Sequence, residues 1–205
     1  MARGRALAGL ALLGLLAACG GEAGAGPGAA SGELTGTVLD PPFEVDPTPL
    51  VDTSGAAYSL TEDTDKDLTL VFFGYTNCPD ICGQVMATLA GTLARLDDEQ
   101  KERVDVVFVT TDPARDTGEV VEDYVSAFDD SIVGVTGPLD DIIGVARSMA
   151  VAVDQGEKLP SGGYEVTHGT RVLAIDADDD STMMWDQDVS QAELYTDITL
   201  LLDEG

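Results

Sequence analysis

Hydrophobic and polar residues follow two different periods along the middle of the chain. Residues 68–73 and 104–109 are continuous apolar runs, which suit strands buried on both faces of a sheet. Residues 81–96 instead repeat their apolar side chains every three or four positions, the spacing of an amphipathic helix. The two periods together predict strands that alternate with helices.

Shorter segments extend this alternation to the C-terminus. Helical patterns cover residues 120–128 and 140–149. Residues 190–202 are amphipathic, and Ser190 followed three positions later by Glu193 predicts a capping box at the start of a final helix. Further strands are expected at residues 34–39, 132–135, 150–153, 171–175 and 182–185, and a hairpin at 50–52 and 58–60.

Two stretches are expected to lack regular structure: residues 41–49, which contain four prolines, and the polar residues 155–163. Strands alternating with helices, then a hairpin and a last helix, predict an α/β sandwich with a mixed central sheet flanked by helices. The first strand and hairpin would form an N-terminal extension of it. We expect residues 34–205 to form one domain.

Charge and composition exclude several functions. The 205-residue chain is 44% hydrophobic, which is typical of a globular protein, and its formal net charge is −28. Such a charge repels nucleic acid and anionic lipid alike. Because the acidic residues are spread along the chain, we interpret them as a heavily solvated surface. A cation-rich partner and attraction of metal ions are weaker alternatives.

The N-terminus has the features of a signal peptide over residues 1–18. Arginines at positions 3 and 5 precede an apolar run, residues 6–16, that is too short to span a bilayer. The run ends in Leu-Ala-Ala before Cys19, which resembles the lipobox of bacterial lipoproteins. The alternative is an ordinary secretory signal with a chance cysteine.

Lipidation of Cys19 would anchor the protein to a membrane. The Gly/Ala-rich residues 19–33 would then form a flexible tether between the anchor and the domain. We therefore expect a lipid-anchored protein on the extracytoplasmic face of the bacterial cell membrane, where paired thiols can oxidise.

Two cysteines follow the first buried strand. Cys78 and Cys82 lie in a polar turn at a predicted helix start, where α/β folds place active sites. If both lie on the first turn, their spacing puts them on one face, and the helix dipole favours the thiolate form. Pro79 suits a helix start. The negative charge of Asp80 opposes thiolate formation but favours a bound cation.

Three interpretations of Cys78 and Cys82 stay open on these residues alone: buried structural cysteines, a redox pair, or ligands of a metal ion. His168, the only histidine, lies 90 residues after Cys78 (168 − 78), before a predicted strand. A lone histidine is more often an ordinary surface or core residue. With two thiolates, however, its imidazole completes a ligand set that suits copper, Cu(I) above all, or zinc.

Other residues are candidates for supporting roles. Met183 and Met184 are soft donors on a predicted strand, where at least one is expected to pack in the core. Asp112 follows the buried strand at residues 104–109 and would lie near the cysteine loop in a parallel sheet. It could orient the copper ligands, or simply shape the turn before Pro113.

Three motifs resemble the Sco/SenC family. Residues 74–82, Gly-Tyr-Thr-Asn-Cys-Pro-Asp-Ile-Cys, are similar to its signature, and residues 112–117 to its Asp-Pro-x-Arg-Asp-Thr motif. Residues 164–169 resemble the segment that carries its histidine. Two departures are Gly83, where many relatives have proline, and Gly169, where serine is common.

The resemblance implies a thioredoxin-like fold on a membrane anchor, with Cu(I) or Cu(II) bound by Cys78, Cys82 and His168. It implies delivery of copper to the dinuclear copper centre of cytochrome c oxidase, or reduction of that centre's thiols. The partners would be the copper-site subunit of the oxidase and a copper donor or thiol–disulfide partner.

Two rival functions use the same cysteines. One is a thiol–disulfide oxidoreductase or thioredoxin-like peroxidase, in which Cys78 and Cys82 form a disulfide when oxidised. The other is an acidic lipoprotein with a purely structural disulfide. We favour a metallochaperone over an enzyme, because only metal binding requires His168.

Overall fold

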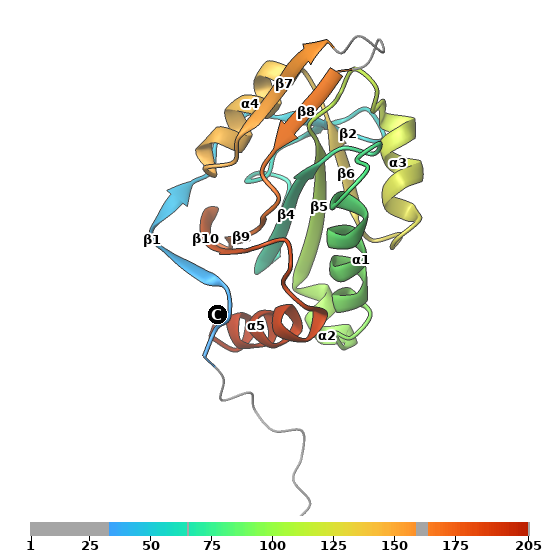
Figure 1. Cartoon of the computed structure of the whole chain (residues 1–205). Helices are drawn as coiled ribbons and strands as arrows, with labels where there is room; N and C mark the ends of the chain where they lie inside the picture. The colour runs from blue at the N-terminus through green and yellow to red at the C-terminus, as the bar shows by residue number, and fades with distance from the viewer. Residues whose placement is uncertain (1–32, 65, 159–163, 205) are drawn as a thin grey trace, which may run out of the picture.

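An eight-stranded mixed sheet forms the centre of the molecule, with helices on both of its faces (Figure 1). The strand order is β1-β10-β9-β4-β5-β6-β2-β3, and β7 and β8 form a separate two-stranded sheet. The computed structural model describes residues 33–64, 66–158 and 164–204, with the backbone alone at 155–158, 164–168 and 204.

The two apolar runs form neighbouring parallel strands at the middle of the sheet. β4 (Leu68–Gly74) and β5 (Val104–Thr110) pair over their whole length, and every residue of β4 is buried. β6 (Val133–Thr136) extends the parallel part beside β5. The prediction of strands buried on both faces is confirmed, and the pairing ends β4 and β5 at the same edge.

Antiparallel strands flank this parallel centre. β9 (Val172–Asp176) pairs with β4, and β10 (Asp180–Trp185) pairs with β9. On the far side, β2 (Leu50–Asp52) pairs with both β6 and β3 (Ala57–Tyr58). The expected hairpin is therefore present, but it completes the central sheet rather than forming an extension beside it.

The first strand differs from its prediction. β1 (Thr37–Glu44) pairs with β10 at the other edge of the sheet and runs through two prolines, Pro41 and Pro42, that we expected to end it. Its register shifts between Val38 and Phe43. Proline is tolerated there because an irregular edge strand does not need every backbone N–H for its ladder.

The segment before His168 also differs from its prediction. β7 (Val153–Lys158) includes residues that we assigned to a polar loop, and it pairs with β8 (Tyr164–His168). The strand expected at residues 150–153 begins only at Val153, because Ala150 has a φ of 55° and ends the preceding helix. A hairpin thus leads up to the histidine.

Helices cover both faces of the central sheet. The predicted helices are confirmed with small shifts at their ends, and the capping box of the last one is present between Ser190 and Glu193. The short α2, capped by Asp97 and Gln100, was not predicted. The helices are α1 (Cys82–Leu93), α2 (Asp98–Glu102), α3 (Gly118–Ser126), α4 (Leu139–Ser148) and α5 (Gln191–Glu204).

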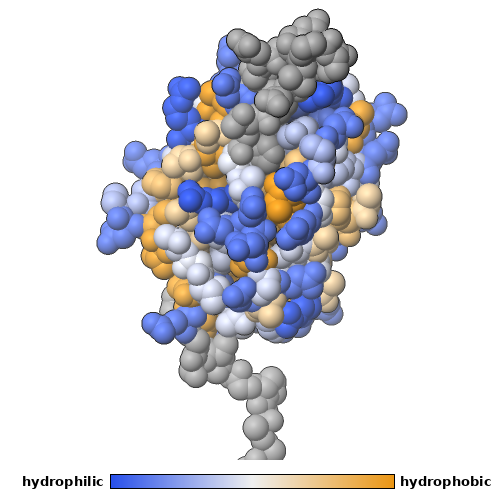
Figure 2. Space-filling view, in the orientation of Figure 1, coloured by the Kyte–Doolittle hydropathy of each residue, from blue (hydrophilic) through white to orange (hydrophobic). Residues whose placement is uncertain are grey.

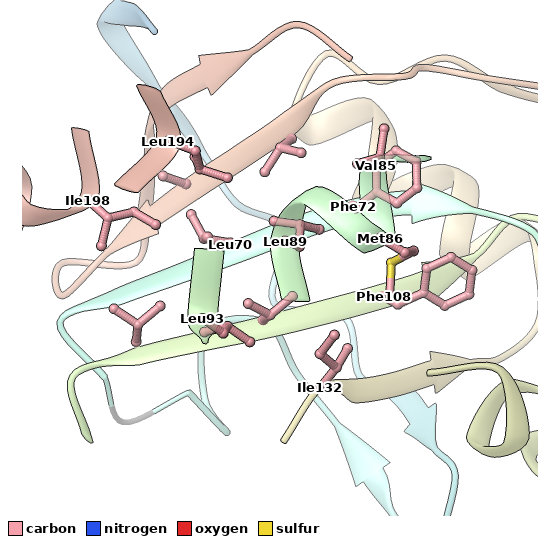
Figure 3. Close-up of a cluster of buried hydrophobic side chains, with 14 of the residues drawn as sticks. Leu70, Phe72, Val85, Met86, Leu89, Leu93, Phe108, Ile132, Leu194 and Ile198 are labelled. Atoms are coloured by element: carbon pink, nitrogen blue, oxygen red, sulfur yellow. The ribbon is translucent and has the colours of Figure 1, made fainter. Parts of the chain in front are cut away.

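Two apolar clusters hold these layers together. The larger lies where α1, α3 and α5 cover one face of the sheet, with Phe72, Leu89 and Leu194 among its buried side chains (Figure 3). The smaller lies under α4 on the opposite face. Outside, hydrophilic residues spread over the visible face and leave only small apolar patches (Figure 2), which agrees with a solvated surface.

Candidate metal and thiol site

The two cysteines occupy different environments at one end of α1. Cys82 is the first residue of the helix and is fully buried, whereas Cys78 lies in the preceding loop and is partly exposed. Only Cys82 is therefore on the first turn, where we had considered placing both. The backbone N–H of Cys78 donates to the Tyr75 carbonyl over 3.2 Å, which turns the loop back toward the helix.

Hydrogen bonds make the two thiols chemically unequal. Burial alone raises the pKa of Cys78, but bonds from the Cys82 thiol and from the backbone amides of residues 80–82 outweigh it and lower that pKa. Burial and the neighbouring Cys78 raise the pKa of Cys82. Cys78 is thus the readier thiolate, with a buried second thiol in hydrogen-bond contact.

Two tyrosine side chains, Tyr75 and Tyr124, lie near this dithiol. Burial first, and then the nearby cysteines, raise the pKa of both Tyr75 and Tyr124. Tyr124, on α3, packs with its ring centroid 5.2 Å from that of Phe108 and 5.2 Å from that of Phe128. The sequence patterns did not point to these rings.

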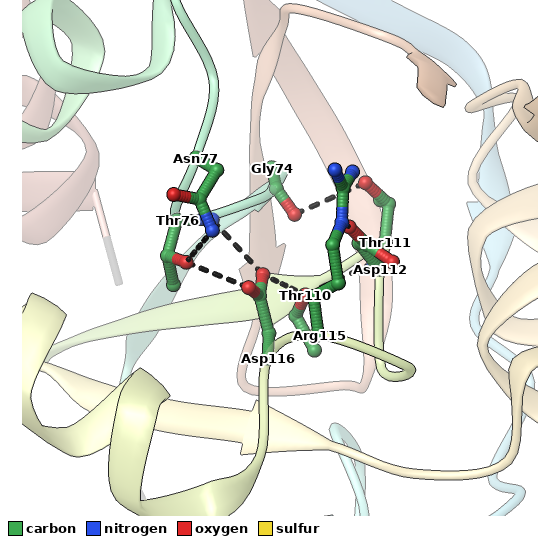
Figure 4. Close-up of polar contacts among 8 residues, drawn as sticks. All are labelled: Gly74, Thr76, Asn77, Thr110, Thr111, Asp112, Arg115 and Asp116. Carbon is green, nitrogen blue, oxygen red and sulfur yellow. Dashed lines mark hydrogen bonds and ion pairs between the residues drawn. The ribbon is translucent and has the colours of Figure 1, made fainter. Parts of the chain in front are cut away.

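The end of β5 lies against the cysteine loop, as the parallel pairing predicts. The Thr111 backbone N–H and hydroxyl donate to the Gly74 carbonyl over 2.6 and 3.1 Å. Thr76, two residues before Cys78, donates its N–H and its hydroxyl to the carboxylate of Asp116 (Figure 4). Asp116 thus contacts this loop directly through its carboxylate.

Asp112 lies two residues beyond the end of β5, next to Thr111, which contacts Gly74. It is buried, and its carboxylate forms an ion pair with Arg115, whose guanidinium lies 6.0 Å from the centroid of the Tyr75 ring. Its carbonyl accepts the backbone N–H groups of Arg115 and Asp116, as in the turn role that we had kept as an alternative. An influence on the copper ligands stays a prediction.

The backbone of His168 comes to the same edge of the sheet. It ends β8, where it pairs with Val153, and the next residue, Gly169, donates its N–H to the Ala152 carbonyl over 2.9 Å. β9 then runs antiparallel to β4, with Val172 opposite Phe72, so the segment before it lies where the cysteine loop begins. The side chain of His168 is outside the described part, and its role as a ligand stays a prediction.

The remaining candidate residues lie in different environments. Met183 is 1% exposed and packs in the larger core cluster, and Met184 packs half-buried against the smaller one. Cys19 lies outside the described residues. Among the side chains that are described, no three or more of the Cys, His, Asp and Glu residues form a group able to hold a metal ion. The described cysteines therefore supply two donors of the expected three.

The model of the SCO1/SenC family matches residues 38–203. The chain belongs to this family. A mouse relative, "Protein SCO1 homolog, mitochondrial", is 33% identical over 150 residues, covering 68% of this chain and 53% of the relative. Yeast "Protein SCO2, mitochondrial" is 30% identical over 132 residues, covering 60% of this chain and 44% of the relative. The chain thus spans about half the length, or less, of these two relatives.

Solved Sco structures share the fold of this chain. Apo Sco1 from Thermus thermophilus superposes with a TM-score of 0.76 at 28% identity, covering 84% of this chain and 99% of that one. Copper-bound ScoI from Arabidopsis thaliana gives 0.69 at 27% identity, covering 79% and 99%. The thioredoxin-like fold that the motifs implied is therefore confirmed.

Proposed function

We propose that this SCO1/SenC protein binds copper through Cys78, Cys82 and His168 and acts in the assembly of the dinuclear copper centre of cytochrome c oxidase. The observation that carries the proposal is the dithiol, with a partly exposed Cys78 in hydrogen-bond contact with a buried Cys82. The His168 backbone lies at the same edge of the sheet.

The donor set suits the cargo. Thiolate sulfur and imidazole nitrogen are ligands that Cu(I) prefers. Cys78 would bind first as the readier thiolate, and Cys82 would lose its proton on binding, which couples copper affinity to pH. Relatives support this choice: a Stutzerimonas stutzeri protein that is 28% identical over 129 residues is described as a putative copper-binding protein.

The same dithiol supports a second function, reduction of a disulfide in the oxidase copper-site subunit. The Cys78 thiolate would attack one sulfur of that disulfide and form a mixed disulfide. Cys82, once deprotonated, would attack the Cys78 sulfur and release a dithiol, leaving Cys78–Cys82 oxidised. The inequality of the two thiols favours this exchange over a purely structural disulfide.

The proposed cellular location rests on the signal sequence at the N-terminus. A lipidated Cys19 would fix the protein to the extracytoplasmic face of the bacterial membrane, with residues 19–33 as the tether. In the part of the chain that the structure describes, no helix is long and apolar enough to cross a bilayer. The lipidation hypothesis rests on the sequence Leu-Ala-Ala-Cys at residues 16–19.

Copper titration of the reduced mature chain, with Cys19 replaced by serine, tests the function. We expect one copper per chain and a thiolate-to-Cu(II) charge-transfer band, both lost in Cys78→Ser and in Cys82→Ser. Turnover with disulfide substrates by the same protein measures the second function. A folded, fully reduced protein that binds no copper but reduces disulfides would overturn the first function in favour of the second.

A further inference from the structure

One buried carboxylate near the dithiol belongs to none of the candidate ligands. Asp116 is 0% exposed and lies between the end of β5 and the start of α3. Its carboxylate accepts three hydrogen bonds: from the Thr76 N–H at 2.9 Å, the Thr76 hydroxyl at 2.6 Å and the Thr110 hydroxyl at 2.6 Å. We call this group of three residues the Asp116 clamp.

The backbone around Asp116 is itself fixed. Its N–H donates to the Asp112 carbonyl over 2.9 Å, and its carbonyl accepts the Thr136 hydroxyl from β6 over 3.2 Å. Thr110 belongs to β5, in the middle of the sheet. The carboxylate is thus attached to the middle of the central sheet, and the cysteine loop is attached to the carboxylate.

Cys78 depends on this attachment more than Cys82 does. Thr76 stands two residues before Cys78, and the Cys78 N–H bond to the Tyr75 carbonyl spans the same short segment. Cys82 is held more firmly: it is fully buried in α1 as a member of the larger core cluster, against which Cys78 packs only partly buried. Loosening Thr76 would therefore move one sulfur while the other stays in place.

We propose that Asp116 is a positioning residue that holds Cys78 within reach of Cys82. It touches neither sulfur and acts through Thr76, and its effect on copper rests on the proposed function. Preorganised thiols close a disulfide, or bind one metal ion together, with little loss of loop entropy. Without the clamp, Cys78 would sample positions away from Cys82, and both reactions would weaken.

Asp197 provides a matched control. This α5 carboxylate is also 0% exposed and accepts hydrogen bonds from Thr35, Gly36 and the Trp185 indole, none of which belongs to the cysteine loop. Asp197→Asn and Asp116→Asn each remove one negative charge from a buried hydrogen-bonded carboxylate. A difference between the two variants at the dithiol therefore reports position rather than general stability.

The test uses the metal-free mature chain with Cys19 replaced by serine. Equilibration with reduced and oxidised glutathione gives the effective concentration of Cys78 and Cys82 for one another. Relative to wild type, we expect it to fall at least about tenfold in Asp116→Asn, equal to a rise of about 30 mV in reduction potential. In Asp197→Asn we expect a change below about twofold.

A milder variant keeps the test valid if Asp116→Asn does not fold. Thr76→Val keeps the backbone N–H bond to Asp116 and removes the hydroxyl bond, and we expect a smaller fall in the same direction. The proposal would be overturned if folded Asp116→Asn had the same effective thiol concentration as wild type in the glutathione equilibrium. If Asp116→Asn is unfolded, the same result in Thr76→Val would overturn it. An equal shift in Asp197→Asn would also overturn it.

The two proposals fail separately. If wild type binds no copper but Asp116→Asn still lowers the effective thiol concentration measured with glutathione, the proposed copper function is wrong and the proposed role of Asp116 is correct. If wild type binds copper and Asp116→Asn leaves both this concentration and the copper charge-transfer band unchanged, the proposed role of Asp116 is wrong and the copper function stands.

Discussion

The molecule uses the same device, a fully buried aspartate that accepts hydrogen bonds from neutral donors, in two regions with different effects. Asp197 joins the N-terminal segment at Thr35 and Gly36 to α5 and β10, across about 160 residues of sequence. Asp116 joins two neighbouring loops at one sheet edge. The first attaches the segment that leads into β1, whereas the second restrains a loop whose ends are already fixed by β4 and α1.

The comparison shows that Asp197 and Asp116 can have different roles although both are fully buried. Loss of Asp197 should be felt mainly as loss of stability, because the indole N–H of Trp185 lies inside the larger core cluster and would have no replacement partner. Loss of Asp116 should be felt mainly as loss of geometry at Cys78. The predictions below test this distinction, from the largest effect to the smallest.

The largest effect is expected for Asp197→Ala. It removes a carboxylate and leaves the buried Trp185 indole N–H without its partner, so the free energy of unfolding should fall by about 3 kcal/mol. Urea denaturation followed by Trp185 fluorescence measures it. Asp116→Ala should cost less, since the partly exposed Thr76 can donate to water instead. Equal losses in the two variants would contradict the distinction.

Gly36→Ala should disturb the Asp197 region without touching its carboxylate. A Cβ at this position would lie 2.5 Å from the Trp185 Nε1 atom, within the group that donates to Asp197. We expect a loss of about 2 kcal/mol in the free energy of unfolding, with an unchanged effective thiol concentration. Gly144→Ala is a suitable control, because a Cβ there meets nothing within 4 Å. An unaltered stability in Gly36→Ala would mean that the indole can move without cost.

The pH dependence of stability should carry the signature of Asp197. Burial opposes its charge, but hydrogen bonds from Trp185, Thr35 and Gly36 outweigh burial and lower its pKa. A lowered pKa adds stability above the unfolded value of about 4, and that stability is lost as the pH falls through the folded value. The stability gap between wild type and Asp197→Asn should therefore narrow below about pH 4. A gap that stays constant down to pH 2 would contradict this assignment.

The smallest effect is expected for Gly83→Pro at the second position of α1. A Cβ there meets nothing within 4 Å, and the first residues of a helix do not need their N–H groups for its own bonds. The substitution should raise the free energy of unfolding by about 0.5–1 kcal/mol. A loss of stability in Gly83→Pro would show that the loop needs the freedom of glycine.

Much of the fold was predictable because local patterns determine it. The continuous apolar runs that became β4 and β5 allowed one interpretation, and Ser190 with Glu193 located the start of α5. β1 was not predictable in full, because an irregular edge pairing accommodates Pro41 and Pro42 that would interrupt an inner strand. The course of β7 into residues 155–158 depends on its partner β8, which the local sequence does not reveal.

The candidate site was likewise only partly predictable from the sequence. The spacing of Cys78 and Cys82 pointed to a joint site, and the roles of these cysteines and of Asp112 stay predictions. The contact of Asp116 with the cysteine loop was not predicted. Contact between Asp116 and Thr76 spans 40 residues and depends on how two strands end together, which no local pattern encodes. Asp197 left a usable signal: it lies on the apolar face of α5, three residues after the buried Leu194.

The central claim is that His168 joins the two cysteines in one copper site. Titration of the reduced mature chain with copper, against a competing chelator, tests it most directly when wild type, His168→Ala and Met184→Leu are compared. The account predicts one tightly held copper per chain in wild type and Met184→Leu, and loss of stable binding in His168→Ala. Wild-type affinity in a folded His168→Ala would remove the histidine from the site and contradict the account.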